Sequence, residues 1–292
     1  MPDSGSFLSL LKQDTYLMSR RTNVIAAALS VFALGSPLIT SCADQGRIYF
    51  EQGIKKFGSD NYQGAIDDWT KALEIAPQEA VVYYNRGNAK RLLNDYQGAI
   101  DDWSMAIEIN PQYASSYYNR GNAKNILGDY QGAIDDWSKT IEIDPRKAVA
   151  YMNRGIVKGN LQDYQGANAD LTKAIEIDPQ LADAYNNRGV VKNQLKDFQG
   201  AFADFSRAIE INPQFDAAYF NRGNSKHRSG DLQGAINDWS KTIEINPQYA
   251  DAYINRGTGR EMQNDLKSAC QDWRKAAELG KKEPAEWVKE AC

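Results

Sequence analysis

The sequence predicts an all-α protein built as a solenoid of repeated helix pairs. The triplet Asn-Arg-Gly returns every 34 residues, at 85–87, 119–121, 153–155, 187–189, 221–223 and 255–257. A proline returns with the same period, at 77, 111, 145, 179, 213 and 247. A fixed period of this length indicates an architecture in which each unit packs only on its neighbours.

Each unit reads as two helices followed by a proline stop. In the second unit Ala99, Trp103 and Ala106 are spaced i, i+4, i+7 and form one buried stripe on the second helix. Gly87 lets the first helix approach this stripe closely, because no side chain projects from it. The aromatic position is filled in turn by Trp69, Trp103, Trp137, Leu171, Phe205, Trp239 and Trp273. This periodicity favours a core role for these tryptophans over ligand stacking.

The pattern of the second unit, with Tyr83, Gly87, Ala99, Trp103 and Pro111, resembles the tetratricopeptide repeat. Two departures recur, since Arg86 stands at a usual leucine and Lys90 at a usual tyrosine. The resemblance covers roughly residues 46–283 as seven tandem repeats. It implies a right-handed α-α superhelix (solenoid) of about seven helix pairs with a concave, protein-binding groove. Residues 284–292, with Trp287 at the aromatic position, are expected to form a carboxy-terminal capping helix.

Composition argues against several classes of function. The net charge of −4 disfavours a nucleic-acid partner, which normally meets a basic face. A single histidine, His227, and three cysteines leave little for metal chemistry or histidine-based catalysis. We therefore expect no enzyme activity, no catalytic residues, no metal and no cofactor.

The amino terminus, residues 1–41, is predicted to be a targeting segment. Arg20 and Arg21 precede an apolar run, and residues 39–42 resemble a bacterial lipobox whose cysteine, here Cys42, is lipidated. Residues 42–45 would then be a short linker, and Met18 is an alternative start. We expect export and a lipid anchor on the extracytoplasmic (periplasmic) side of a membrane. The other interpretation is an uncleaved membrane anchor.

Cys270 and Cys292 remain as a pair if Cys42 carries a lipid in an oxidising compartment. We predict a disulfide between them that fastens the cap to the last repeat. The alternative is two unpaired, small core residues, because sequence alone cannot establish the geometry.

Asparagines return at one position of every triplet. Helical residues advance by about 100°, so Asn85 points nearly opposite Gly87, toward the concave side implied by the resemblance. Its amide offers a donor and an acceptor, which match a peptide group. A similar asparagine ladder occurs in the superhelix of O-linked N-acetylglucosamine transferase. The predicted peptide-binding residues are Asn85, Asn119, Asn153, Asn187, Asn221 and Asn255, with Tyr84, Tyr118, Asn88 and Asn122 beside them.

Two outcomes stay open for this ladder. If it binds peptide, alanine at Asn119, Asn153 and Asn187 should weaken peptide capture and barely change the melting temperature. In the alternative, each asparagine bonds the backbone of a neighbouring repeat and sets the superhelix.

Arginine and aspartate recur in step. The triplet arginines follow at Arg86, Arg120, Arg154, Arg188, Arg222 and Arg256, and the second helices carry Asp68, Asp102, Asp136, Asp170, Asp204, Asp238 and Asp272. We predict interhelical ion pairs, because a guanidinium can meet a carboxylate through two hydrogen bonds. Pairing within a repeat would leave Asp68 to Gln52, and pairing to the preceding repeat would leave Asp272 free. A row of anion-binding arginines is the other interpretation.

The sequence as a whole predicts a non-catalytic scaffold that binds an extended peptide or partner protein in the concave groove. Its expected task is to assemble or localise a membrane or envelope complex. The alternative is a mainly architectural array that associates with itself.

Overall fold

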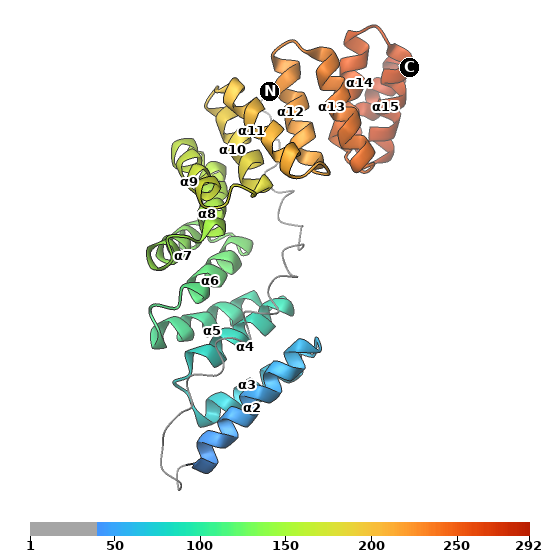
Figure 1. Cartoon of the computed structure of the whole chain (residues 1–292). Helices are drawn as coiled ribbons and strands as arrows, with labels where there is room; N and C mark the ends of the chain where they lie inside the picture. Colours follow the sequence, from blue (N-terminus) through green and yellow to red (C-terminus); the bar gives the residue numbers. More distant parts are fainter. Residues whose placement is uncertain (1–39) are drawn as a thin grey trace. The chain divides into compact units, whose positions relative to one another are not determined.

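The computed structural model describes residues 40–292, and the side chains of residues 44–292 except Glu290. Throughout this range the chain forms helices joined by short turns, with no strand (Figure 1). The predicted all-α class is therefore confirmed. The predicted targeting segment lies outside the described residues, apart from the backbone of Thr40 and Ser41, and so does the side chain of Cys42.

The helices alternate between first and second members of a pair. The first helices are α2 (Thr40–Gly58), α4 (Ala80–Leu92), α6 (Ala114–Ile126), α8 (Ala148–Asn160), α10 (Ala182–Gln194), α12 (Asp216–Arg228) and α14 (Ala250–Met262). The second helices are α3 (Tyr62–Ile75), α5 (Tyr96–Ile109), α7 (Tyr130–Ile143), α9 (Tyr164–Ile177), α11 (Phe198–Ile211), α13 (Leu232–Ile245) and α15 (Leu266–Glu278). A last helix, α16 (Lys282–Ala291), follows α15.

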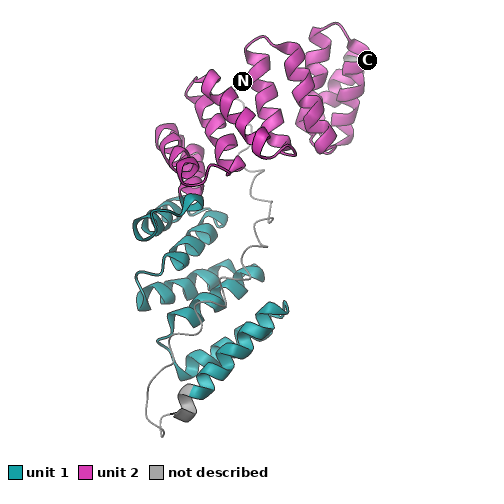
Figure 2. Cartoon of the chain, in the orientation of Figure 1, with its two compact units in different colours: residues 1–150 teal, residues 151–292 magenta. Residues whose placement is uncertain are grey.

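The chain divides into two compact units, residues 1–150 and 151–292 (Figure 2). In the first unit α4 packs against α5, its own second helix, and also against α3 of the preceding pair. In the second unit α12 packs in the same way against α13 and α11. Each unit is thus a stretch of solenoid in which contacts run between neighbours in sequence.

The turn inside each pair is built by a repeated capping contact. The carboxylate of Asp95 accepts a hydrogen bond from the backbone N–H of Gly98, three residues on, and so caps α5. Asn61, Asp129, Asp163, Asp197, Asp231 and Asp265 cap the other second helices in the same way. The residue just before the cap takes a left-handed conformation, as at Asn94 (φ 62°) and Gly128 (φ 85°). This sharp reversal places the two helices of a pair side by side.

The tryptophan stripe forms the core, as predicted. Trp69, Trp103 and Trp137 are at most 1% exposed, and Trp239 and Trp273 are at most 3% exposed. A Cβ atom at Gly87 would lie 2.8 Å from Nε1 of Trp103, so only glycine allows the first helix to sit this close.

Each triplet arginine binds an aspartate of its own repeat. Nε and Nη2 of Arg86 donate hydrogen bonds of 3.0 and 2.7 Å to the two carboxylate oxygens of Asp102. The same two bonds join Arg120–Asp136, Arg154–Asp170, Arg188–Asp204, Arg222–Asp238 and Arg256–Asp272. The pairing left open by the sequence therefore runs within a repeat.

A second cation reaches each carboxylate. Nζ of Lys90 lies 2.9 Å from Asp102, and later repeats place Lys124, Lys158, Lys192, Lys226 and Arg260 at 2.7–2.9 Å from their aspartates. Asp68 is met by Lys56 at 2.7 Å, so the expected partner Gln52 was wrong. Lys56 stands at the repeat position of Lys90, so a lysine alone compensates the charge of Asp68 in the repeat that lacks the arginine.

The third arginine nitrogen reaches the preceding repeat. Nη1 of Arg86 donates to the hydroxyl of Thr70 on α3 at 3.1 Å. Ser104, Thr172, Ser206 and Ser240 accept the equivalent bond. The guanidinium carbon of Arg86 also lies 5.5 Å from the ring centre of Tyr83. Because these donors are engaged inside the fold, the geometry does not support a row of anion-binding arginines.

The carboxy-terminal end is closed by α16. This helix packs on α15, and the Trp287 ring meets the Trp273 ring edge to face at 5.5 Å between centroids. It begins at Lys282, two residues before the predicted start of the cap. A disulfide joins Cys270 on α15 to Cys292, with their Cα atoms 5.8 Å apart.

Removal of one arginine should be costly. Arg120→Leu leaves the carboxylate of Asp136, 5% exposed, with only Lys124 as its charged partner. We expect the free energy of unfolding to fall by about 2–3 kcal/mol, measured by urea denaturation. Lys173→Leu, which breaks an exposed pair with Glu176, should cost less than about 1 kcal/mol. Equal midpoints for the two variants would contradict a structural role for the arginine.

Candidate functional site

The candidate site is the side of the first helices that faces away from their own second helices, here called the first-helix face. It carries the residues predicted to bind peptide, although one of the ten, Asn122, also reaches Trp137 on its own second helix. Their exposure to solvent differs widely. Asn85, Asn119 and Asn187 are only 3%, 5% and 1% exposed. Tyr118 is also buried, whereas Asn153, Asn221, Asn255, Tyr84, Asn88 and Asn122 are half-buried. Half of the six asparagines are therefore largely shielded from solvent, and the peptide-binding role of the set stays a prediction.

Some of these asparagines form hydrogen bonds between repeats. Nδ2 of Asn119 on α6 donates to Oδ1 of Asn88 on α4 at 2.9 Å and to the hydroxyl of Tyr84 at 3.3 Å. In the second unit Asn255 donates to Asn224 at 2.8 Å. These amides join neighbouring first helices through bonds between side chains. The architectural alternative predicted bonds to the backbone of the neighbouring repeat instead.

The fifth repeat departs from this arrangement. Asn187 donates to the backbone carbonyl of Asp183 within its own helix at 2.8 Å. Its neighbour Asn186 takes over the bridging role and accepts a hydrogen bond from Asn221 at 3.0 Å. The asparagine bridge is thus kept between α10 and α12 with a different residue as acceptor.

The next turn of the first helices links this face to the core. Oδ1 of Asn122 accepts a hydrogen bond from Nε1 of Trp137 at 3.1 Å, and Asn224 does the same for Trp239 at 3.0 Å. These amides lie between the tryptophan stripe and the first-helix face. A partner that contacts these amides therefore contacts side chains that hydrogen bonds to buried tryptophans hold in place.

Sequence reasoning missed two aromatic residues of this face. Tyr113 precedes α6 and its ring lies 4.9 Å from that of Tyr84, while Tyr249 precedes α14 and lies 4.9 Å from Phe220. Burial raises the pKa of both tyrosines above their ordinary value, so their hydroxyls remain neutral. The signal was present in the repeated sequence Pro-Gln-Tyr just before each of these first helices.

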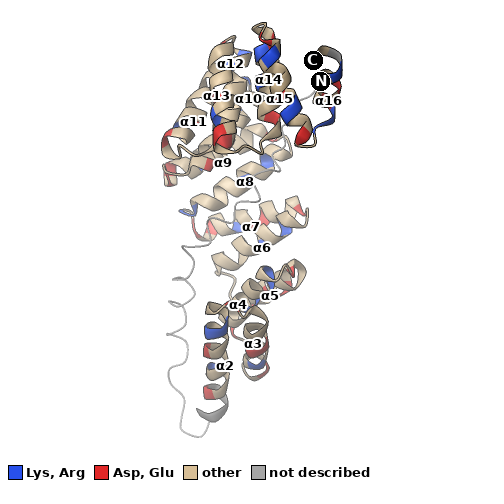
Figure 3. Ribbon diagram, turned by 90° about the vertical axis from the view of Figure 1, so that its right-hand side faces the viewer, with Lys and Arg blue, Asp and Glu red and all other residues tan. Residues whose placement is uncertain are grey.

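Other predicted features lie apart from this face. His227 is exposed, with its ring 5.8 Å from that of Trp239. Basic and acidic residues occur together along the helices (Figure 3). Within residues 40–292 we find no cluster of three histidine, cysteine or acidic side chains arranged for a metal ion. In the same range no helix combines the length and apolar character needed to cross a bilayer.

The asparagine bridge makes a prediction about stability. Asn119→Ala removes both hydrogen bonds and leaves a buried gap, so we expect a loss of about 1–2 kcal/mol in the free energy of unfolding, read by urea denaturation. This replaces the sequence-based expectation of an unchanged melting temperature. The exposed Asn160 has no hydrogen bond within the described residues, and Asn160→Ala should change stability little. An unaltered midpoint for Asn119→Ala would show that the bridge contributes nothing.

Comparison with family models identifies the repeats. The model described as TPR repeat matches residues 87–125 and 223–258. Two models described as tetratricopeptide repeat match 114–147 and 182–215, and 148–181. No curated protein matches the chain in sequence.

Solved structures share the fold. The chain is similar to MamA, with 28% identity over 55% of this chain and 93% of that one and a TM-score of 0.51. It is 25% identical to YrrB over 64% of this chain and 97% of that one, with a TM-score of 0.53. A tetratricopeptide repeat protein from Parabacteroides merdae, 20% identical, covers 84% of this chain and 98% of its own at a TM-score of 0.64, and it supports the fold alone. The described chain is thus a tetratricopeptide-repeat protein.

Proposed function

We propose that this protein is a non-catalytic scaffold that binds an extended segment of a partner protein along the first-helix face. Tetratricopeptide folds support protein interaction in general, and the finer proposal rests on one observation. Each unit presents an equivalent, half-buried aromatic pair on this face, Tyr84 with Tyr113 and Phe220 with Tyr249. Aromatic rings are enriched at the centres of protein interfaces.

The neighbouring side chains suit a polypeptide. Met152 and Ile254 are half-buried on the same face and offer apolar contacts to alternate side chains of an extended segment. The half-buried Asn221 and Asn255 each donate one bond to the preceding first helix, and a primary amide has a second N–H and a carbonyl oxygen that match the acceptor and donor of a peptide group. YrrB is described as a tetratricopeptide protein with an unusual peptide-binding site, which supports the same class of ligand here.

Site-specific photo-crosslinking tests this proposal. Benzoylphenylalanine at Tyr84 or Phe220 should give crosslinks to a partner in native membranes, because it replaces a half-buried aromatic side chain of the proposed interface. The matched controls are positions Asp101 and Asn237, which are exposed on second helices. Mass spectrometry of the adducts reads the result. Equal adducts from both pairs of positions would rule out the first-helix face as the binding surface.

Self-association is the second candidate function. It is favoured by the asparagine bridges, since Asn119 and Asn255 use their amides on neighbouring repeats and so serve the architecture of the array. In the same experiment, adducts that contain only a second copy of this chain would support this candidate over a separate partner.

We also propose that the protein is exported and held at a membrane, with assembly or localisation of a membrane or envelope complex as its task. The proposal is supported by Arg20 and Arg21, the apolar run after them, and the lipobox-like residues 39–42. A lipid on Cys42 would hold the repeats at the extracytoplasmic face of the membrane, where they would bind their partner.

Metabolic labelling with a fatty-acid analogue tests the anchor. The wild-type chain should carry the label, and Cys42→Ser should lose it, because a thioether-linked lipid needs this thiol. Cys292→Ser, which removes a cysteine of the terminal disulfide, should keep the label and serves as the control. Persistent label in Cys42→Ser would exclude lipidation at this position.

A further inference from the structure

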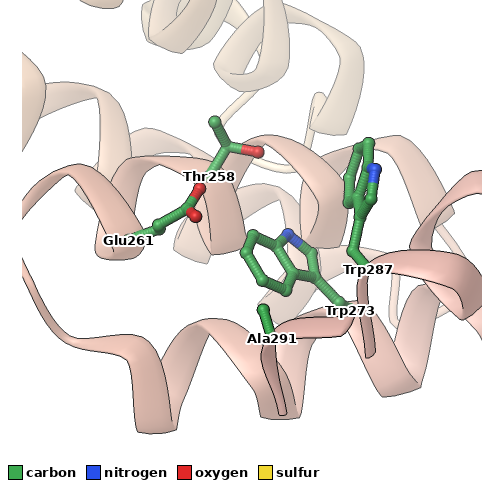
Figure 4. Close-up of a pocket in the computed structure, with 5 residues that line it drawn as sticks. All are labelled: Thr258, Glu261, Trp273, Trp287 and Ala291. Atoms are coloured by element: carbon green, nitrogen blue, oxygen red, sulfur yellow. The ribbon is translucent and has the colours of Figure 1, made fainter. Parts of the chain in front are cut away.

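A pocket of about 360 Å³ lies at the carboxy-terminal end, between α14, α15 and α16. It is lined by Thr258, Glu261, Trp273, Trp287 and Ala291. Figure 4 shows the Trp273 ring in the middle, with Thr258 and Glu261 on one side and Trp287 on the other. The volume is within the range of sites that hold a small ligand or a single side chain.

This pocket contains a buried donor without an acceptor. Trp273 is 3% exposed, and its Nε1 has no hydrogen-bond partner in the described part of the chain. The equivalent nitrogens of Trp137 and Trp239 donate to Asn122 and Asn224. A buried polar group of this kind normally has a partner, so an orphan needs an explanation.

The residue beside this nitrogen also differs from those of two other repeats. Thr258 stands 34 residues after Asn224, at the position whose amide oxygen accepts the indole N–H in the third and sixth repeats, whereas Trp69 and Trp103 donate to backbone carbonyls of their first helices. Threonine is shorter, so the space of the missing amide group opens into the pocket. An acceptor supplied by a ligand can occupy that space and satisfy Trp273.

The cap helix forms one wall of the pocket. α16 packs on α15 and contributes Trp287 and Ala291 to the lining. The disulfide between Cys292 and Cys270 fastens this wall to α15.

The rim of the pocket is acidic. Glu261 is exposed and makes no ion pair with any described residue. The nearest basic residue in sequence, Arg260, lies 2.7 Å from Asp272, and Lys281 lies 2.6 Å from Asp251. Glu261 thus places a carboxylate in the same pocket as two indole rings, and this combination attracts a cation with an apolar stem.

We propose that this pocket binds a lysine residue of a partner polypeptide. The ammonium group meets Glu261, the methylene groups lie against Trp273 and Trp287, and the lysine's own backbone carbonyl accepts the hydrogen bond from Nε1 of Trp273. The inference rests on the proposed protein-binding function but uses the pocket at the cap and not the aromatic pairs of the first-helix face. It assigns the carboxy-terminal cap a recognition role in addition to closing the core.

The test is an NMR titration of the full chain with Nα-acetyl-lysine amide. The six tryptophans give six indole N–H signals, and Trp273→Phe identifies one of them, a change with a precedent at Phe205. The Trp273 signal should shift and saturate with the lysine probe. Nα-acetyl-norleucine amide lacks the ammonium group and should bind about tenfold more weakly, as should the lysine probe to Glu261→Gln.

Thr258→Asn is the matched variant, because it restores the residue found at positions 122 and 224. It should shift the Trp273 signal in the absence of probe and abolish the response to lysine, while the signals of Trp69, Trp103 and Trp137 stay in place as a check of folding. Tyr84→Ala should leave the titration unchanged, which separates this site from the first-helix face.

Three results would overturn the proposal. One is the absence of a saturable shift, which would mean that the indole N–H is served by water only. Another is equal binding of the lysine and norleucine probes. The third is an undiminished response in Thr258→Asn. None of these would bear on the photo-crosslinking test of the first-helix face, so the two proposals can fail independently.

Discussion

The buried aspartate of each second helix is the group on which the packing of the repeats depends. A carboxylate as enclosed as Asp102, 4% exposed, is costly unless opposite charges and hydrogen bonds compensate it. Arg86 and Lys90 from the first helix meet it together, and the remaining arginine nitrogen extends to Thr70 of the preceding repeat. One guanidinium therefore holds three helices in register. Hydrogen bonds to Asp238 likewise raise the pKa of Arg222, so the charge persists at any physiological pH.

This constraint decides which side chains reach the first-helix face. With the arginine directed at its own second helix and Gly87 against Trp103, Asn119 is turned toward the preceding first helix, where Asn88 and Tyr84 receive it. Asn119, Asn221 and Asn255 thus serve the array, and the half-buried aromatic pairs remain for a partner. A rigid framework with a few accessible aromatic residues is a good basis for recognition, because little conformational entropy is lost on binding.

The last described repeat is linked covalently to its cap. Cys270 takes the position that isoleucine fills in repeats such as those of Ile100 and Ile236, and a disulfide joins it to Cys292. Trp287 covers Trp273 from the side. The pocket beside Thr258 lies between these elements. In the third and sixth repeats an asparagine stands at the position of Thr258 and accepts the indole hydrogen bond that Trp273 lacks.

The sequence by itself determined the period, the helix pairs, the tryptophan core and the chemical partners of the arginines. These follow from local rules, since a helix turns by a known angle and a repeated glycine or proline acts on its own backbone. Only the tertiary structure decided that Arg86 pairs with Asp102 in its own repeat and that Asn85, Asn119 and Asn187 are buried while Asn221 is half-buried. The helical angle gives the direction of a side chain relative to its own helix axis. Whether that direction leads to solvent depends on the neighbouring helix, whose placement is set by contacts distant in sequence.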